Sequence, residues 1–137
     1  MEINILAVLA CAVVSMVVGA VWYGPLFGQK WMEVCKVDKA DVEARKKMQQ
    51  EAMPLYLVQF VLTFFQAYVL AHFIEAWSDA SGIAAALWIW AAFVIPTTAA
   101  ASMWTAEPTR MKWARFLIQG GYYLVLFILF GAILAAW

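Results

Sequence analysis

Charged side chains are scarce in this sequence. Asp, Glu, Lys and Arg together make up 13% of its 137 residues, against about a quarter in a typical soluble domain. None of them falls inside the four long apolar stretches, which cover residues 3–21, 55–74, 83–104 and 116–137. Charges inside a membrane are the usual mark of proton relays, ion paths and coupled transport, and the spans of this sequence lack that mark.

The same absence excludes one class of small transporter. Small multidrug exporters have a similar length and four spans, and they depend on a glutamate within the first helix. Here no acidic residue occurs between Glu2 and Glu33. We therefore reject that assignment.

Metal-binding and redox residues are few. Cys11 lies in an apolar run and Cys35 in a polar loop, with no CxxC or Cys/His spacing, so we expect neither a disulfide nor a metal site. His72 is the only histidine, and Glu75 follows it by three residues. This pair has the chemistry to bind a metal or sense pH. Two ligands do not make a site, and we favour hydrogen bonding at the membrane interface.

Catalytic constellations are missing as well. The sequence shows no Ser/His/Asp set, no glycine-rich phosphate loop and no carboxylate pair, and Gly120-Gly121 is a candidate for helix packing. We therefore expect no catalytic residue, no cofactor and no enzyme activity. The formal net charge of +0 also gives no reason to expect a nucleic-acid partner.

Apolar residues are abundant, at 66% of the chain, with a mean hydropathy of +0.80. A soluble domain of this length has too little interior to bury so much apolar surface. Each apolar stretch is about 20 residues long, which suffices to cross a bilayer as a helix. The sequence predicts an all-α integral membrane bundle, residues 1–137 forming one domain. We expect its spans at about 3–23, 54–77, 82–105 and 113–137.

The first span ends in an aromatic motif, Trp22-Tyr23-Gly24-Pro25. Its two rings fit a membrane interface, and Gly-Pro predicts the end of the helix. The loop that follows, residues 24–53, is the only sizeable polar segment. Asp38 can cap a short amphipathic helix running to about Ala52, although a solvated connector fits the same residues.

Lysine and arginine predict the orientation. All nine lie in residues 24–53 or in and beside residues 105–113, and the second loop has none. The positive-inside rule then places these two loops in the cytoplasm and both termini outside. The expected location is the cell (inner) membrane, with the lipid bilayer as the first partner.

Uncharged polar residues follow the helix faces. Seven of them form a candidate polar cluster, most of it in the cytoplasmic half: Ser15, Gln59, Thr63, Gln66, Thr98, Ser102 and Gln119. On a helical wheel the three of the second span share one face, which we expect to point into the bundle. The cluster fits a polar pocket open to the cytoplasm. It equally fits interhelical hydrogen bonds, which we favour.

Pro96 removes one backbone hydrogen bond from the third span and predicts a bend there. The hydroxyls of Thr97 or Thr98 are placed to repair the gap. Such a bend can act as a gate, but it more often gives a helix its shape.

The run from Gly19 to Met32, Gly-Ala-Val-Trp-Tyr-Gly-Pro-Leu-Phe-Gly-Gln-Lys-Trp-Met, resembles the signature of a bacterial family catalogued as domain of unknown function 1761. The segments Ala67–Ile74 and Phe93–Thr97 fit the same family. Its members have a similar length, four predicted spans and a first helix that ends in Trp-Tyr-x-Pro. The resemblance implies the fold and no activity.

Three functions remain after these exclusions. The leading hypothesis is a non-catalytic membrane protein that works by self-association or as an accessory subunit of a membrane complex. Small-residue pairs such as Ser15/Gly19, Ala67/Ala71 and Ala132/Ala136 favour a homo-oligomer. The second hypothesis is a pathway for a small uncharged solute or ion, formed by an oligomer. The third is an enzyme acting on a lipid or quinone. We rank it last because the sequence shows no converging set of catalytic groups.

Overall fold

The computed structural model describes residues 2–137, and within them the chain is helical and without strands. Four of its helices are long and apolar enough to cross a membrane, spanning Ile5–Leu26, Val42–Ala76, Gly82–Met103 and Thr109–Ala136. The all-α fold with four candidate spans, expected from the sequence, is confirmed. In chain order the elements are α1 (Ile5–Val21), η1 (Trp22–Leu26), α2 (Gly28–Val34), α3 (Val42–Ala76), α4 (Gly82–Ile89), η2 (Trp90–Val94), α5 (Ile95–Met103) and α6 (Thr109–Ala136).

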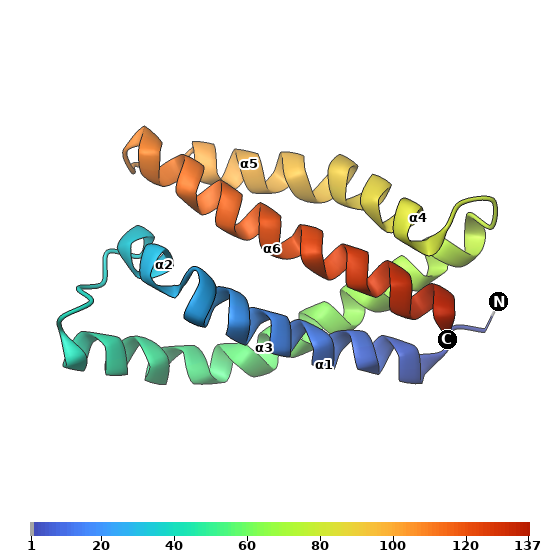
Figure 1. The fold of residues 1–137 in the computed structure, drawn as a ribbon, viewed down its shortest axis with the longest axis horizontal. Helices are drawn as coiled ribbons and strands as arrows, with labels where there is room; N and C mark the ends of the chain where they lie inside the picture. The colour runs from blue at the N-terminus through green and yellow to red at the C-terminus, as the bar shows by residue number, and fades with distance from the viewer. Residues whose placement is uncertain (1) are drawn as a thin grey trace.

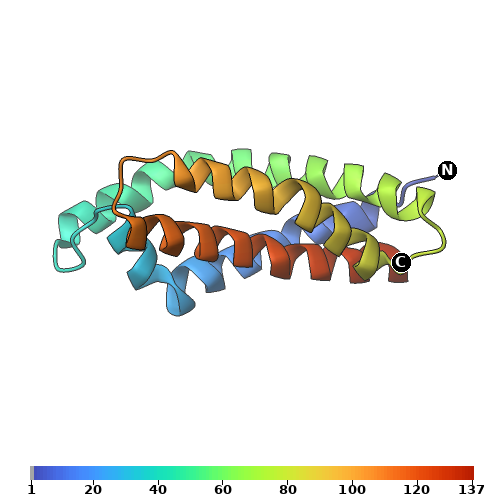
Figure 2. The ribbon, with the colours of Figure 1, turned by 90° about the horizontal axis from the view of Figure 1, so that it is seen from above.

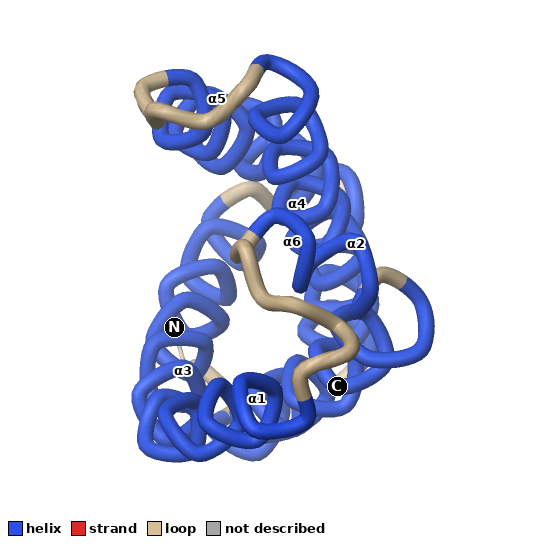
Figure 3. Tube along the Cα trace, turned by 90° about the vertical axis from the view of Figure 1, so that its left-hand side faces the viewer, coloured by secondary structure: helices blue, strands red, loops and turns tan. Residues whose placement is uncertain are grey.

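The long helices lie side by side along one axis (Figure 1). Both termini and the α3–α4 connection lie at one end, which we call the terminal end. The α2–α3 and α5–α6 connections lie at the other end, here called the loop end (Figures 1 and 2). Helix α6 lies between the α1–α3 pair and the α4–α5 span (Figure 3), and it packs against α1, α4 and α5.

Helix α1 starts where its sequence supplies a cap. The Asn4 side-chain oxygen accepts hydrogen bonds from the backbone N–H groups of Leu6 at 3.0 Å and Ala7 at 3.3 Å. This satisfies two of the donors that the first turn leaves free. The inward face of α1 carries small and apolar side chains, and Val8, Cys11 and Ser15 are fully buried.

The first span does not end at Gly24-Pro25, as the sequence suggested. It continues through η1, a π-helical turn with Pro25 inside it, and ends at Leu26. In a π-turn each N–H donates to the carbonyl five residues earlier, instead of four residues earlier as in an α-helix. Accordingly, the Phe27 N–H donates to the Trp22 carbonyl at 2.9 Å. The wider turn lets the helix pass the proline.

The first loop also differs from the prediction of a separate helix over residues 38–52. A short helix does form there, but it is α2, which ends in a Schellman-type motif with Lys36 at φ 60°. Residues 42–52, which the sequence predicts as part of a separate helix, instead form the first third of α3. Helix α3 is a single 35-residue helix with Pro54 inside it. Its N-cap is Asp41, whose carboxylate accepts from the Ala44 N–H at 3.0 Å, and not Asp38.

The third span is interrupted before Pro96, by the π-turn η2 between α4 and α5. Of the two hydroxyls expected near the proline, that of Thr97 donates to the Phe93 carbonyl at 2.6 Å. The π-turn shifts the backbone pairing at the point where proline has no N–H to donate.

The closest packing and the apolar core both lie toward the terminal end. A Cβ on Gly131 would lie 2.6 Å from the Gly82 carbonyl oxygen, so α4 and α6 touch backbone to backbone. Leu126, Phe127 and Phe130 of α6 are buried against Val8, Cys11, Ala67 and Leu70 of α1 and α3. We call these seven residues the apolar plug. Toward the loop end the helices spread apart, which leaves room for a cavity.

Candidate functional site

A cavity of about 760 Å³ lies at the loop end of the bundle. Its walls are the first half of α3 on one side, the α1–η1–α2 segment on the other, and the middle of α6. We call it the loop-end cavity. Its location follows from the elements above, because α3 extends past the membrane span while α2 turns back beside α6.

The α3 wall is one stripe of the helix: Arg45, Met48, Gln49, Ala52, Tyr56 and Gln59. These residues follow the spacing i, i+3, i+4, i+7, i+11 and i+14, which places them on one face. Most of the stripe is polar or amphipathic. In a packed helix pair this face would meet its neighbour, but here the cavity separates it from α1 and α2.

The α1–η1–α2 wall gains its space from small residues. Gly19, Ala20, Gly24 and Gly28 all line the cavity. A Cβ added to Gly28 would lie 2.8 Å from the Tyr23 carbonyl oxygen, so glycine is required where α2 begins against η1.

Aromatic rings and amides form the α6 side of the cavity. The Tyr122 hydroxyl donates to the Ser15 carbonyl at 3.1 Å and joins α6 to α1. The Tyr122 ring meets Tyr23 at 5.4 Å and Tyr123 at 5.2 Å between centroids, and Tyr23 meets Trp31 at 5.0 Å, each edge to face. Such contacts hold rings in fixed orientations, so this wall is preformed. Gln119 lies one turn before Tyr122 and Tyr123 and completes it.

Ion pairs hold α2 against the start of α6 at the rim. Glu33 accepts from Arg110 at 2.9 Å and from Lys30 at 3.3 Å. Arg115 pairs with Glu107, and its guanidinium lies 5.7 Å from the centre of the Trp31 ring. The hydrogen bond and charge of Lys30, and after them the hydrogen bond from Arg110, lower the pKa of Glu33; the hydrogen bond from Arg115 lowers the pKa of Glu107. The α2 wall is therefore tethered.

One family model matches almost the whole chain. It is described as "Protein of unknown function (DUF1761)" and covers residues 6–135. The chain belongs to this family. No curated protein and no solved structure matches it. The resemblance noted from the Trp22–Phe27 motif is confirmed, and it supplies a family without an assigned activity.

The polar cluster expected for this DUF1761 member is divided in the structure. Ser15, Gln59 and Gln119 line the loop-end cavity. Thr63 is buried just beneath it, where its hydroxyl donates to the Gln59 carbonyl at 2.8 Å and accepts from the Gln59 amide at 3.1 Å. Gln66, the next residue on that face, is half-buried.

Thr98 and Ser102 lie on α5 and do not line this cavity. Ser102 is buried, and its hydroxyl has no hydrogen-bond partner among residues 2–137. The sequence predicts these two residues in the cluster because their depth in the span is similar to that of the others. In the structure α6 lies between α5 and the cavity (Figure 3).

The helix-end motif has a role that the sequence did not reveal. The Trp22 indole N–H donates to the Ile118 carbonyl at 2.9 Å, and the Trp90 indole donates to the Gly120 carbonyl at 3.2 Å. Both tryptophans begin a π-turn. Gly121 admits the Trp22 ring, since a Cβ there would lie 3.0 Å from it. The only sequence signal for Trp90 is its position deeper than an interfacial belt.

His72 and Glu75 lie far along α3 from this cavity. The His72 ring packs edge-on against Tyr68, with centroids 4.8 Å apart. Among residues 2–137 no group of three His, Cys, Asp or Glu side chains is placed to hold a metal ion.

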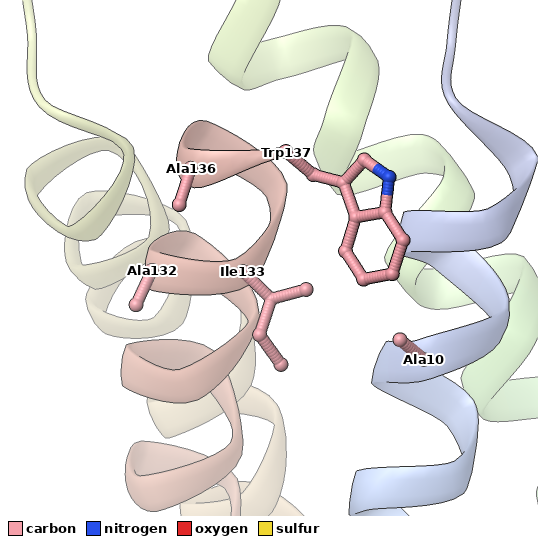
Figure 4. A pocket seen from close by; sticks show the side chains of 5 residues that line it. All are labelled: Ala10, Ala132, Ile133, Ala136 and Trp137. Carbon is pink, nitrogen blue, oxygen red and sulfur yellow. The ribbon is translucent and has the colours of Figure 1, made fainter.

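A second hollow lies at the terminal end, between α1 and the end of α6. It has a volume of about 730 Å³ and is lined by Ala10, Ala132, Ile133, Ala136 and Trp137. In Figure 4 the Trp137 ring lies across the gap from α6 toward Ala10. Its lining side chains offer only one polar atom, the indole nitrogen, so the loop-end cavity is the better candidate site.

Proposed function

We propose that this protein is a non-catalytic membrane protein that binds a small, hydrogen-bonding molecule in the loop-end cavity. The observation that carries the proposal is the cavity itself, about 760 Å³ of space between preformed walls of tyrosine, tryptophan and glutamine. Concave sites with aromatic walls and a few placed polar groups are typical of small-molecule binding. Its inner lining is uncharged, which favours an uncharged molecule, or the uncharged part of one.

The closed inner end supports binding in preference to passage through a single chain. Beyond Gln59 and Gln119 the bundle is filled by the apolar plug, in which Leu126 and Phe130 are fully buried. A solute that enters from the loop end therefore meets a dry barrier. A pathway for a small uncharged solute or ion would have to form between chains of an oligomer.

The lining also supports binding without reaction. It offers amides, phenols, an indole and thioethers, with Arg45 as the one charged side chain. No carboxylate, histidine or cysteine lines it to act as a base or nucleophile. With the loop end in the cytoplasm, as the basic loops favour, the molecule would be taken from the inner side of the cell membrane.

The test is to fill the cavity. Ala52 lines it, and Ala52→Trp should occupy part of its volume; Ala76→Trp is the matched control, because Ala76 is exposed at the end of α3 and does not line the cavity. Native mass spectrometry in mild detergent measures bound small molecules. We expect a bound molecule on the unchanged protein and on Ala76→Trp, and its loss from Ala52→Trp. No bound molecule in any of them, or the same one in all three, would contradict the proposal.

Self-association, or association with a larger membrane complex, is the second candidate. Two of the small-residue pairs that favoured it are used within the chain, because Ser15 and Ala67 are fully buried and Ala71 nearly so. Support now comes from α5, whose Pro96, Thr97, Ala100 and Ala101 are exposed. Small residues let membrane helices approach closely, and a second copy of the chain fits such a face.

A mass measurement in mild detergent tests this candidate. We expect a dimer or larger assembly that Ala100→Leu shifts toward the monomer, while Leu57→Ala on the exposed side of α3 leaves it unchanged. A monomer at every protein concentration would contradict self-association.

A further inference from the structure

The single positive charge on the cavity wall is unusual within this protein. The chain has three arginines. Arg110 pairs with Glu33 and Arg115 pairs with Glu107. Arg45 forms no ion pair with any described residue, and its guanidinium donates only to the Lys39 carbonyl, at 3.4 Å. Arg45 is therefore the one guanidinium with its capacity for a carboxylate or phosphate unused.

Arg45 lies on the same cavity wall as groups in the interior of the cavity. It begins the α3 stripe that ends at Gln59, so the same wall carries a cation at the rim and an amide at the inner end. The apolar part of α3 starts at Leu55, ten residues later, which is about 15 Å along the helix. When α3 spans the bilayer, this places Arg45 outside the hydrocarbon core, on the water side of the lipid head groups.

Groups deeper in the cavity are uncharged and have hydrogen-bonding capacity left. Gln119, Tyr23 and Tyr123 line it, and their side-chain polar groups make no hydrogen bond to other described residues. The Gln59 amide uses one N–H on Thr63 and keeps its oxygen free. A ligand can therefore pair with uncharged groups along its length and with a cation at one end only.

We propose that the ligand is a molecule with an oxyanion, a phosphate or carboxylate, at one end and an uncharged hydrogen-bonding body at the other. Arg45 binds the oxyanion at the rim, and Gln59, Gln119 and the tyrosines receive the body. The absence of carboxylates from the lining excludes a cationic ligand, which would lose its hydration without gaining a counter-ion. The assignment rests on the proposed function, because it names the chemistry of the molecule bound in that cavity.

Two sources supply such a molecule. It is either an amphiphile of the inner leaflet, which enters from the bilayer, or a soluble phosphate or carboxylate, which enters from the water at the loop end. Both place the oxyanion at Arg45, so both depend on the same guanidinium. They differ in whether an acyl chain is needed for binding.

The experiment titrates the full-length protein in mild detergent with three probes, read by native mass spectrometry. Dioctanoyl phosphatidate carries an oxyanion and ester groups on acyl chains, glycerol phosphate carries an oxyanion and hydroxyls without a chain, and dioctanoylglycerol has the chains without the charge. We expect at least one oxyanion probe to bind, and dioctanoylglycerol to bind at least about tenfold more weakly. Binding of phosphatidate alone identifies an amphiphile, and binding of glycerol phosphate identifies a soluble ligand.

The decisive comparison is Arg45→Gln with Lys46→Gln. Both remove one positive charge from adjacent exposed positions of α3, but Lys46 does not line the cavity. Arg45→Gln should weaken binding of the oxyanion probe about tenfold and Lys46→Gln less than about twofold. Arg45→Lys, which keeps the charge and loses the planar fork, should lie between them. Equal effects of the two glutamine variants, or dioctanoylglycerol binding as well as phosphatidate, would overturn the assignment.

Ala52→Trp separates this failure from failure of the proposed function. If it abolishes binding of a probe and Arg45→Gln does not, the cavity binds small molecules and only the oxyanion assignment is wrong. If the probes bind equally to the unchanged protein and to Ala52→Trp, they bind elsewhere and both proposals fail.

Discussion

At the scale of single residues, two tryptophans determine how the spans meet α6. Trp22 and Trp90 come from different spans, yet both donate to carbonyls of α6 beside Gly120-Gly121. Each begins a π-turn, and these wider turns occur frequently at functional sites. Trp22 also lies next to Tyr23, which lines the cavity, so this hydrogen bond fixes one cavity wall relative to α6.

Trp22→Phe should therefore destabilise the bundle. The change removes the indole donor to the Ile118 carbonyl while keeping an aromatic ring, and the lost hydrogen bond contributes about 1 kcal/mol. Trp88→Phe is the control, because Trp88 is exposed on α4 and makes no hydrogen bond to other described residues. Thermal unfolding in detergent measures both. Equal midpoints for the two variants would show that the indole N–H does not stabilise the contact.

The ion pair between Glu107 and Arg115 predicts a dependence on pH. Its carboxylate side chain is only 11% exposed, and the hydrogen bond from Arg115 lowers its pKa. A group with a lowered pKa stabilises the fold at neutral pH, and this contribution disappears as the pH falls through the folded-state pKa. Acid should thus destabilise the unchanged protein more than Glu107→Gln, whose stability at pH 7 is already reduced. If the free energy of unfolding changes with pH in the same way for both proteins, the prediction is wrong.

At the scale of elements, α3 separates this structure from a simple four-span bundle. Its 35 residues extend about 52 Å, well beyond a hydrocarbon core of about 30 Å. The extension supplies the stripe that faces the loop-end cavity. If residues 42–53 were a separate helix on the membrane surface, this wall and the cavity would not exist.

A distance measurement distinguishes the two arrangements. Spin labels replacing Lys46 and Phe60 lie fourteen residues apart on α3, which corresponds to roughly 21 Å in one continuous helix. We expect a narrow distance distribution near that value by electron paramagnetic resonance. A distribution that is much shorter, or broad, would indicate a break at Pro54 and would remove the α3 wall.

Much of the element structure follows from the sequence, and the exceptions have physical reasons. The four spans were predictable because continuous apolar runs of about 20 residues have one stable form in lipid. The continuity of α3 was not predictable from the sequence. Pro54 fits the first turn of a new helix, and it equally fits the interior of a continuous helix where the carbonyl that it leaves unpaired lies near water. Likewise Gly24-Pro25 signals a helix end, and only the backbone geometry shows a π-turn that continues.

The candidate site was predictable only in part. Ser15, Gln59 and Gln119 follow from polarity and depth along the spans, and all three line the cavity. The cavity roles of Tyr23, Tyr56 and Arg45 do not follow from the sequence, because they depend on the positions of η1 and α3 relative to α6. Thr98 and Ser102 match in depth, but the helix order places them outside the cavity.

At the scale of the whole molecule, the two ends of the bundle differ in charge. The loop end carries all the lysines and arginines, and the terminal end carries Glu2, Glu75 and Asp79. We predict that the loop end faces the cytoplasm. In intact cells Cys35 should then resist a membrane-impermeant thiol reagent, and Asp79→Cys should react with it. Reaction of Cys35 after the cells are permeabilised is the control, and the opposite pattern in intact cells would reverse the topology.

The central claim is that the bundle is open to small molecules at the loop end and closed by the apolar plug. Gln119→Cys and Leu126→Cys test it most directly, in a background with Cys11→Ala and Cys35→Ser. The two positions lie seven residues apart on one face of α6, the first in the cavity and the second in the plug. We predict that a small charged thiol reagent applied to the loop end modifies Gln119→Cys and leaves Leu126→Cys unmodified. If Gln119→Cys is as unreactive as Leu126→Cys, the cavity is closed to solutes and the account is wrong.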